Sequence, residues 1–315
     1  MSNIQTTINT IATANGGTHM NKEFYDRKLL ETASTKQVHA KFGQKRTIPK
    51  NSGKKVEFRR YDLFEPSEAI TPLVEGVTPE GQTLSQSKVE AEVAQYGAYV
   101  EVSDMLELTA YDEVVADSAD LLGEQLGTVM EWITRDAICA GTNVQYAGGK
   151  TARGLLTLSD RLTVDEIRKA VRTIKKAKPR YFADSKQEDG KKNARNPHFI
   201  CICSPEATYD LQSDPLWQDT SKYSNAEQIY SGEIGRLFGV VFVESTEAKV
   251  FAKSGAVDSE TGEAIDVHAT LIFGADAYGV VDIGGLGVLE TIVKTPGSAG
   301  AMDPLNQRGT VGAKV

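Results

Sequence analysis

Residues 103–140 have the apolar spacing of a helix over about ten turns. Apolar side chains recur there every three or four positions: Leu108, Tyr111, Val115, Leu122, Leu126, Val129, Ile133 and Ala137. Asp104 with Glu107 resembles a capping box, and Gly141 is a plausible residue just past the end. Such a helix would be about 55 Å long, whereas a compact domain of this length is only about 50 Å across. We therefore expect either a break near residues 110–112 or a flattened protein with this helix as its spine.

The composition excludes several classes of protein. Apolar residues make up 40% and charged residues 25% of the 315 residues, which is ordinary for a soluble chain with one large or two smaller domains. No apolar run is long enough to span a membrane, and residues 1–17 lack the features of a signal peptide. Three cysteines do not make a disulfide framework, which fits a reducing cytoplasm. A net charge of −8 argues against nucleic-acid binding over the whole surface, although local patches can differ.

Between residues 42 and 103 the pattern changes to the alternation that is typical of strands with one buried face. Residues 55–59, 90–93 and 96–102 all alternate. The connection between the first two is punctuated by proline and glycine, and a long connection of this kind is uncommon unless it has a function. A two-stranded hairpin alone is only marginally stable in water. We therefore predict that this hairpin extends from the body and lies on another chain.

Charge favours the same interpretation. The first arm of the hairpin is basic, whereas residues 103–140 are acidic apart from Arg135. A basic hairpin and an acidic helix can pair head to tail between copies, and such contacts close into rings. The alternative is that both are solvated faces. The candidate contact residues are Lys54, Lys55, Val56, Phe58, Arg59 and Arg60 on the hairpin, and Asp112, Glu113, Asp117, Asp120 and Glu124 on the helix.

After Gly141 the sequence mixes helices and strands without a βαβ period, which indicates an α+β arrangement. A helix is expected over residues 163–176, where Thr163 can be the cap and Glu166 follows three positions later. A shorter helix is expected over residues 205–211, and strands at 198–203, 240–243, 270–273, 280–283 and 288–293. We expect residues 184–196 and 297–315 to be irregular, residues 1–20 to be a flexible arm, and residues 21–40 to be an exposed helix.

Motifs that would carry catalytic chemistry are weak. Residues 148–151 (Gly-Gly-Lys-Thr) resemble the end of a phosphate loop, but the first glycine of that motif is replaced by Val144. Cys201 and Cys203 with His198 could suggest a metal site, but no second pair of ligands is evident, and buried free cysteines are the alternative. No zinc-protease or nucleophile-elbow motif occurs. The sequence therefore predicts a structural protein without catalytic residues, cofactor or metal.

Several short motifs carry a resemblance to a known family. They are residues 103–109 (Ser-Asp-Met-Leu-Glu-Leu-Thr), 121–125 (Leu-Leu-Gly-Glu-Gln), 135–137 (Arg-Asp-Ala), 140–142 (Ala-Gly-Thr), 204–206 (Ser-Pro-Glu) and 303–312 (Asp-Pro-Leu-Asn-Gln-Arg-Gly-Thr-Val-Gly). Together with the order of the parts, they are similar to one branch of the major capsid proteins of tailed bacteriophages, which have the Hong Kong 97-type fold. The resemblance covers nearly the whole chain.

The resemblance implies an α+β fold in four parts. Residues 1–40 would be the N-terminal arm and helix, and residues 41–96 the extended E-loop hairpin with its flanking strands. Residues 97–140 and 284–315 would form the peripheral domain with the spine helix, and residues 141–283 the mixed α/β axial domain. Because relatives usually continue into a closing strand, the C-terminus after Val315 is expected to be truncated or differently finished.

The implied function is self-assembly, in pentamers and hexamers, into the icosahedral shell around a phage DNA genome. Assembly is expected in the bacterial host cytoplasm, without a membrane or sequence-specific DNA binding, and with portal, separate scaffolding and possible decoration proteins as partners. One alternative is an encapsulin-type shell, and a remote one is a phosphate-loop enzyme built on Lys150 and Thr151. Gly123 and Gly127 are expected to allow close backbone approach or bending of the spine. A basic cluster near residue 176 either faces DNA or is a solvated helix end.

Overall fold

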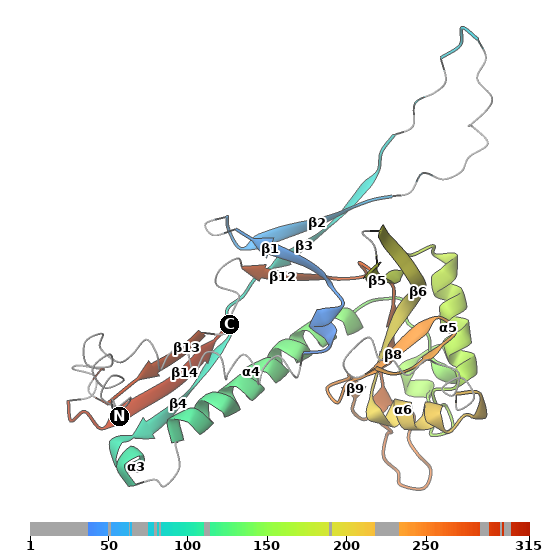
Figure 1. Cartoon of the computed structure of the whole chain (residues 1–315). Coiled ribbons are helices and arrows are strands. Elements are labelled where there is room, and N and C mark those ends of the chain that lie inside the picture. The colour runs from blue at the N-terminus through green and yellow to red at the C-terminus, as the bar shows by residue number, and fades with distance from the viewer. Residues whose placement is uncertain are drawn as a thin grey trace.

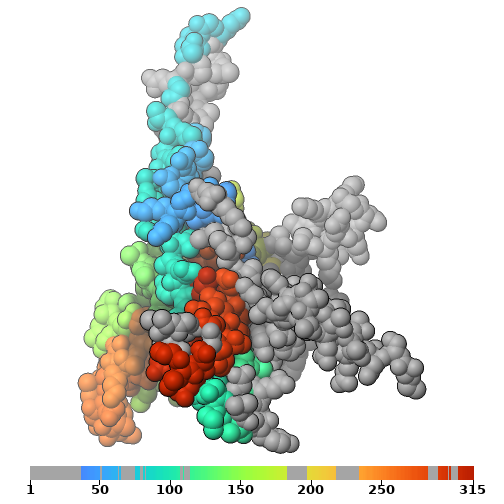
Figure 2. All heavy atoms as spheres, turned by 90° about the vertical axis from the view of Figure 1, so that its left-hand side faces the viewer, coloured from blue at the N-terminus to red at the C-terminus, as the bar shows by residue number. Residues whose placement is uncertain are grey.

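The computed structural model describes residues 37–49, 52–62, 64, 75–78, 81, 83–109, 114–188, 191–217, 233–283, 290–296, 298 and 304–315. Within these ranges the protein is elongated and mixes helices with sheets (Figure 1). A long helix, α4 (Val114–Cys139), joins a small three-stranded sheet at one end to a larger mixed unit at the other. A two-stranded hairpin extends away from both (Figure 2). The predicted N-terminal arm lies outside the described residues, as does most of the helix predicted over residues 21–40.

The structure describes two helices within residues 103–140, and the break expected near residues 110–112 lies outside the described residues. α3 (Asp104–Thr109) ends before α4 begins, and α4 alone is about 39 Å long. The prediction of Asp104 as cap is wrong, because the Ser103 hydroxyl accepts the N–H of Leu106 at 3.2 Å. Gly141 follows the end of α4 without the left-handed backbone of a terminal glycine. A serine hydroxyl is as good a cap as a carboxylate, so the sequence alone did not separate the two.

The small sheet packs against α4. Its strand order is β13 (Glu290–Lys294), β14 (Arg308–Lys314) and β4 (Gly97–Ser103), all antiparallel. Leu122 and Leu126 of α4 lie in one buried cluster with Val311 and Ala313 of β14. The prediction that residues 297–315 are irregular is wrong for β14, which is the central strand of this sheet. Its two glycines and its alanine hide the strand pattern, but the small size of Ala313 allows α4 to lie close to the sheet.

The hairpin consists of β2 (Lys55–Tyr61) and β3 (Gln86–Glu92), with Lys55 opposite Glu92 and Tyr61 opposite Gln86. Its base rests on a parallel pair of strands, β1 (Gln44–Ile48) and β12 (Gly279–Ile283). The Phe58 ring occupies the space that a Cβ at Gly279 would need, and the Arg46 guanidinium lies 5.0 Å from the centre of that ring. A glycine at this position therefore lets the hairpin base lie against β12.

The mixed unit is built on a five-stranded sheet. Its strands are β11 (Leu271–Phe273), β6 (Lys191–Cys203), β8 (Val240–Glu244) and β7 (Glu233–Leu237) in this order, with β5 (Phe182–Glu188) paired to β6. The smaller elements are η1 (His39–Lys41), η2 (Ala147–Gly149), η3 (Arg153–Leu155), β9 (Val250–Phe251) and β10 (Val267–His268). Residues 184–196, expected to be irregular, pair as β5 and the first part of β6, which is a correction. Their sequence is polar, so no apolar alternation indicates a strand.

Both faces of β6 are covered. Phe199 and Cys201 lie in the cluster formed with α5 (Val164–Lys176) and α6 (Pro205–Gln212), whereas Ile200 and Ile202 face a second cluster around Phe42. The predicted cap of α5 forms, because the Thr163 hydroxyl accepts an N–H group of the first turn. The Ser204 hydroxyl caps α6 in the same way, which the sequence analysis did not predict. Within the described ranges, no helix combines the length and apolar character that crossing a membrane requires.

Candidate functional site

The hairpin has two different faces, because successive side chains of a strand point to opposite sides. One face carries charges that pair with one another: Lys55 with Glu92 at 3.7 Å, Arg59 with Glu57 at 2.9 Å, and Lys88 with Glu90 at 2.9 Å. All of these pairs are exposed, so each contributes only about 0–1 kcal/mol. The hairpin as a whole is therefore less basic than its first arm alone, because β3 supplies acidic partners.

The other feature of the hairpin is a set of exposed apolar side chains. Val56 and Phe58, the apolar residues singled out in the sequence, are half-buried, and Phe58 already contacts Gly279 of the same chain. More than half of the surface of five other large apolar side chains is exposed: Tyr61, Phe64, Val77, Leu84 and Val89. Sequence reasoning missed these five because they have no regular spacing. Their only signal was apolar character within a stretch rich in proline and glycine.

The acidic candidates on α4 divide into three groups. Asp117 and Glu124 are exposed, and Asp120 is half-buried. Asp112 and Glu113 lie outside the described residues. The hairpin is directed away from α4 in the same chain, so the structure does not bring the basic and acidic candidates together within one copy (Figure 1). Leu121, between the exposed carboxylates, is the most exposed large apolar side chain of α4.

A buried carboxylate fastens the start of the hairpin region to α4. Glu131 is fully buried, and its Oε1 accepts the backbone N–H groups of Val38 at 2.9 Å and His39 at 3.0 Å. The Nδ1 atom of the His39 ring lies 2.6 Å from the same oxygen, and Oε2 is 3.1 Å from the His39 backbone nitrogen. One carboxylate thus satisfies three donors of the segment that leads into β1.

Tyr278, just before β12, completes this joint. Its hydroxyl donates to the backbone carbonyl of His39. Burial raises the pKa of the Tyr278 hydroxyl, and the negative charge of Glu131 raises it further, so the group stays a donor over the physiological range. Its ring packs edge-on against Phe273 at 5.3 Å. The joint therefore connects α4, η1 and the segment before β12, and His39 and Glu131 lie 92 residues apart in the sequence.

A second joint holds the C-terminal end of α4 to the connection between β8 and β9. The Trp132 ring N–H donates to the Glu247 carboxylate at 2.6 Å, and Arg135 donates to the Glu247 carbonyl at 2.8 Å. Lys249 lies 3.0 Å from Asp136, which also accepts from Arg135 at 2.9 Å. Burial raises the pKa of Asp136, but the hydrogen bonds from Arg135 and Lys249 outweigh this effect and hold it below its ordinary value. The helix is thereby fixed to the mixed unit.

The glycine-rich loop does not have the features of a phosphate site. Gly148 and Gly149 both have positive φ angles, 63° and 68°, and they form the short turn η2. The Asp160 carboxylate lies directly against Gly148, where a side chain would otherwise be, and the Thr157 hydroxyl donates to the same carboxylate at 2.8 Å. A negative charge against the loop opposes phosphate binding. These glycines are explained by a tight turn that packs on Asp160.

A serine, a histidine and a glutamate meet near α6, a combination that the sequence did not suggest. The Ser204 hydroxyl is 3.2 Å from Nδ1 of His268, and the Glu206 carboxylate is 3.7 Å from the same nitrogen. A nucleophilic triad needs the serine and the carboxylate on opposite nitrogens of the ring. Ser204 also accepts the N–H of Ala207 at 3.3 Å as the cap of α6. The arrangement is that of a helix cap.

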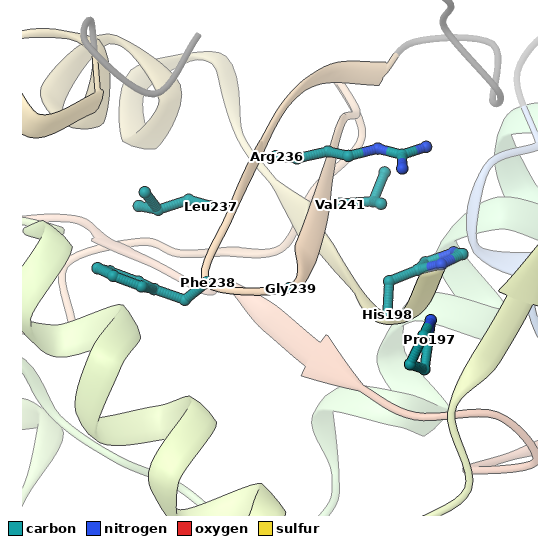
Figure 3. A pocket seen from close by; sticks show the side chains of 7 residues that line it. All are labelled: Pro197, His198, Arg236, Leu237, Phe238, Gly239 and Val241. Carbon is teal, nitrogen blue, oxygen red and sulfur yellow. The ribbon is translucent and has the colours of Figure 1, made fainter. Parts of the chain in front are cut away.

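One cavity of about 340 Å³ lies beside β6, β7 and β8 (Figure 3). It is lined by Pro197, His198, Arg236, Leu237, Phe238, Gly239 and Val241. Figure 3 places Arg236 and His198 on one side of it and Leu237 and Phe238 on the other. Cys201 and Cys203 are buried free thiols. Within the described residues, no three histidine, cysteine, aspartate or glutamate side chains gather as metal ligands would.

Comparisons with known proteins agree with this architecture. Residues 134–285 match the family model of phage capsid proteins. The capsid of Ralstonia phage GP4 matches with a TM-score of 0.63 and 15% identity, over 88% of this chain and 82% of that chain. The head structure of Helicobacter pylori bacteriophage KHP40 matches with a TM-score of 0.58 and 12% identity, over 88% and 79%. The capsid of cyanophage P-SCSP1u matches with a TM-score of 0.56 and 14% identity, over 89% and 83%. A comparison with curated protein sequences found no match.

The family match and the fold support one another. Identities of 12–15% show a common fold, and this fold extends over most of the chain. The family match begins near the end of α4 and continues to the end of β12, so it includes the mixed unit and all of the second joint except Trp132. On these two findings the chain has the fold of phage capsid proteins, and its residues 134–285 match the phage capsid protein family.

Proposed function

We propose that copies of this chain assemble as pentamers and hexamers into an icosahedral shell that encloses a double-stranded DNA genome. The observation that supports this most strongly is the hairpin, which extends from the body with five exposed apolar side chains. A neighbouring copy that covered them would stabilise the shell by about 25 cal/mol per Å² of apolar surface. Each contact is modest, but the shell repeats it in every subunit.

The parts of the fold then take the following roles. Residues 1–40 form the N-terminal arm, and residues 41–96 form the E-loop, which lies along the spine helix α4 and the periphery of a neighbour. Residues 97–140 and 284–315 form the peripheral domain, and residues 141–283 form the axial domain, which meets its copies at the capsomer centre. Asp117 and Glu124 are the exposed acidic side chains that α4 offers to a neighbour.

The partners follow from this role. A portal, a separate scaffolding protein and possible decoration proteins would contact the shell, and assembly would take place in the host cytoplasm. DNA would be enclosed without recognition of its sequence, which suits a chain with a net charge of −8. Hydrogen bonds and salt bridges between copies would determine register more than affinity.

Electron microscopy of the purified protein tests this function directly. We expect closed particles of uniform size, formed by the chain alone or with the scaffolding protein of its phage. Particles from infected cells should contain DNA, whereas an encapsulin-type shell would contain cargo protein instead. If the chain stays monomeric at every concentration, with and without scaffolding protein, the proposed function is wrong.

Gly123 and Gly127 lie buried on α4, and each costs about 1 kcal/mol relative to alanine within a helix. We expect Gly123→Ala and Gly127→Ala to impair shell assembly or expansion despite better helix propensity, because a methyl group in a packed site costs about 1–3 kcal/mol. Particle diameter by microscopy and melting temperature measure the two effects. Gly154→Ala is the control, since the nearest atom to its new methyl group would be 4.0 Å away. Variants that assemble and expand normally would remove this role.

A further inference from the structure

The outward face of α5 is unusual for this acidic chain. The helix lies at the edge of the mixed unit, and Val164, Ile167 and Val171 pack its inner side against the sheet (Figure 1). Its outer side carries exposed cations, and no large apolar side chain of α5 is exposed. A helix of 13 residues presents this face over about 20 Å.

The cations divide into two groups according to their partners. In the first half of α5, Arg168 lies 3.0 Å from Asp165 and Lys169 lies 2.8 Å from Glu166. The second group consists of Arg172, Lys175, Lys176 and Lys178, all exposed. None of these four forms an ion pair within the part of the chain that the structure describes. We call these four residues the α5 patch.

The helix dipole accounts for only part of this patch. Cations in the last turn of a helix gain about 0.3–1 kcal/mol each, which fits Lys175 and Lys176. The effect falls off within one turn, and Arg172 lies before that turn while Lys178 lies beyond the helix end. The stability of α5 therefore explains two of these cations, Lys175 and Lys176, but not Arg172 and Lys178.

The composition of the patch indicates the kind of partner. Contacts between proteins are depleted in lysine at their centres and rely on aromatic and other apolar anchors, which α5 lacks on its outer face. Three of the four residues are lysines, which bind phosphates as compact charges. A patch of lysines without apolar anchors matches the regular line of charge on a nucleic-acid backbone better than it matches a protein surface.

We propose that the α5 patch contacts the phosphate backbone of the packaged double-stranded DNA, so that α5 lies on the inner surface of the shell. This inference rests on the proposed enclosure of DNA. If all four cations reach phosphates, the affinity of the protein for DNA falls about 100-fold between 50 and 200 mM salt. Binding by one copy is therefore weak at physiological salt and independent of sequence. Many copies of this weak contact over the inner surface of the shell retain the DNA while leaving it free to slide during packaging.

The salt dependence of DNA binding by the full-length protein tests the proposal. The probe is a fluorescent 30-base-pair duplex, titrated with the protein between 50 and 200 mM NaCl. For Lys175→Gln with Lys176→Gln, the slope of log affinity against log salt should decrease by about two, because two phosphates are no longer neutralised by the protein. Lys175→Arg with Lys176→Arg should retain the slope of the unmodified protein.

A control pair removes the same charge elsewhere. Lys150 and Lys253 are exposed lysines outside α5, and Lys150→Gln with Lys253→Gln should leave the slope unchanged. An equal decrease of the slope in both pairs would show that only net charge matters, and would overturn the proposal. So would an unchanged slope in the α5 pair.

Assembly of the variants distinguishes a DNA-binding surface from a contact between copies. If the Lys175→Gln, Lys176→Gln protein forms no shells while the control pair does, the α5 patch is a contact between copies and not a DNA surface. If shells form and retain DNA normally at every salt concentration, this inference fails and the proposed shell function stands. The absence of shells in the unmodified protein would instead contradict the proposed function itself.

Discussion

Replacing Glu131 with alanine should destabilise the protein by about 3–5 kcal/mol, because it removes the acceptor of the fully buried His39 and of the part-buried Val38. The backbone N–H groups of Val38 and His39 and the His39 ring would be left without their acceptor, and burial denies them water. For a chain of 315 residues such a change lowers the melting temperature by roughly 5–8 °C. Calorimetry of the unassembled protein measures it without a contribution from contacts between copies.

Two further variants separate the contribution of the Glu131 hydrogen bonds from general effects of charge. Glu131→Gln keeps the shape but replaces one acceptor oxygen with a donor, so it should still be clearly less stable than the unmodified protein. Glu124→Gln removes the same charge from an exposed position of the same helix and should change stability by no more than about 0.5 kcal/mol. Equal melting temperatures for Glu131→Gln and the unmodified protein would show that the carboxylate does not fasten η1.

Replacing Val89 with aspartate should leave the fold intact and prevent efficient assembly. The Val89 side chain is 68% exposed on β3, so a polar replacement disturbs little within one copy. In the shell the same position would have to bury a charge and would forgo about 1.5–3 kcal/mol of apolar burial at every copy. Since each 1.4 kcal/mol is a factor of ten, the protein concentration needed for assembly should rise at least about 10-fold.

Sedimentation analysis and microscopy over a range of concentrations measure this threshold, and calorimetry checks the fold. Val257→Asp is a matched control: that valine is also 68% exposed but lies in the mixed unit, away from the hairpin. Val89→Ile should assemble normally, because it keeps the apolar surface. Normal assembly of Val89→Asp would mean that the hairpin does not use this face to hold a neighbour.

The elements that could be predicted are those with a local signal. Leu122 and Leu126 repeat at helical spacing, and both face the sheet as a helix of that pattern requires. The Thr163 hydroxyl lies 3.4 Å from the N–H of Glu166, because a cap depends only on residues three positions apart. The alternation at residues 55–59 likewise identified β2. Each signal lies within a few residues of the feature it predicts.

The features that could not be predicted depend on partners distant in the chain. Glu131 looked like one of many acidic residues on a solvated helix, and only the folded chain brings His39 to it. β14 has small residues, and their role in packing is evident only when α4 covers them. Neither a buried polar contact nor a glycine-rich central strand has a periodic pattern that marks it. The exposed apolar residues of the hairpin also escaped notice, because side chains outside the chain's own core need no regular spacing.

The central position of β14 has a consequence for synthesis. Its partner β4 precedes it by 205–217 residues in the chain, as the pairs Ser103–Arg308 and Gly97–Lys314 show. A ribosome that adds 5–20 residues per second needs about 10–40 s to cover that interval. Throughout this time the nascent chain carries α4 with an uncovered apolar face, a natural client for chaperones. The small sheet therefore closes only after β14 has left the ribosome.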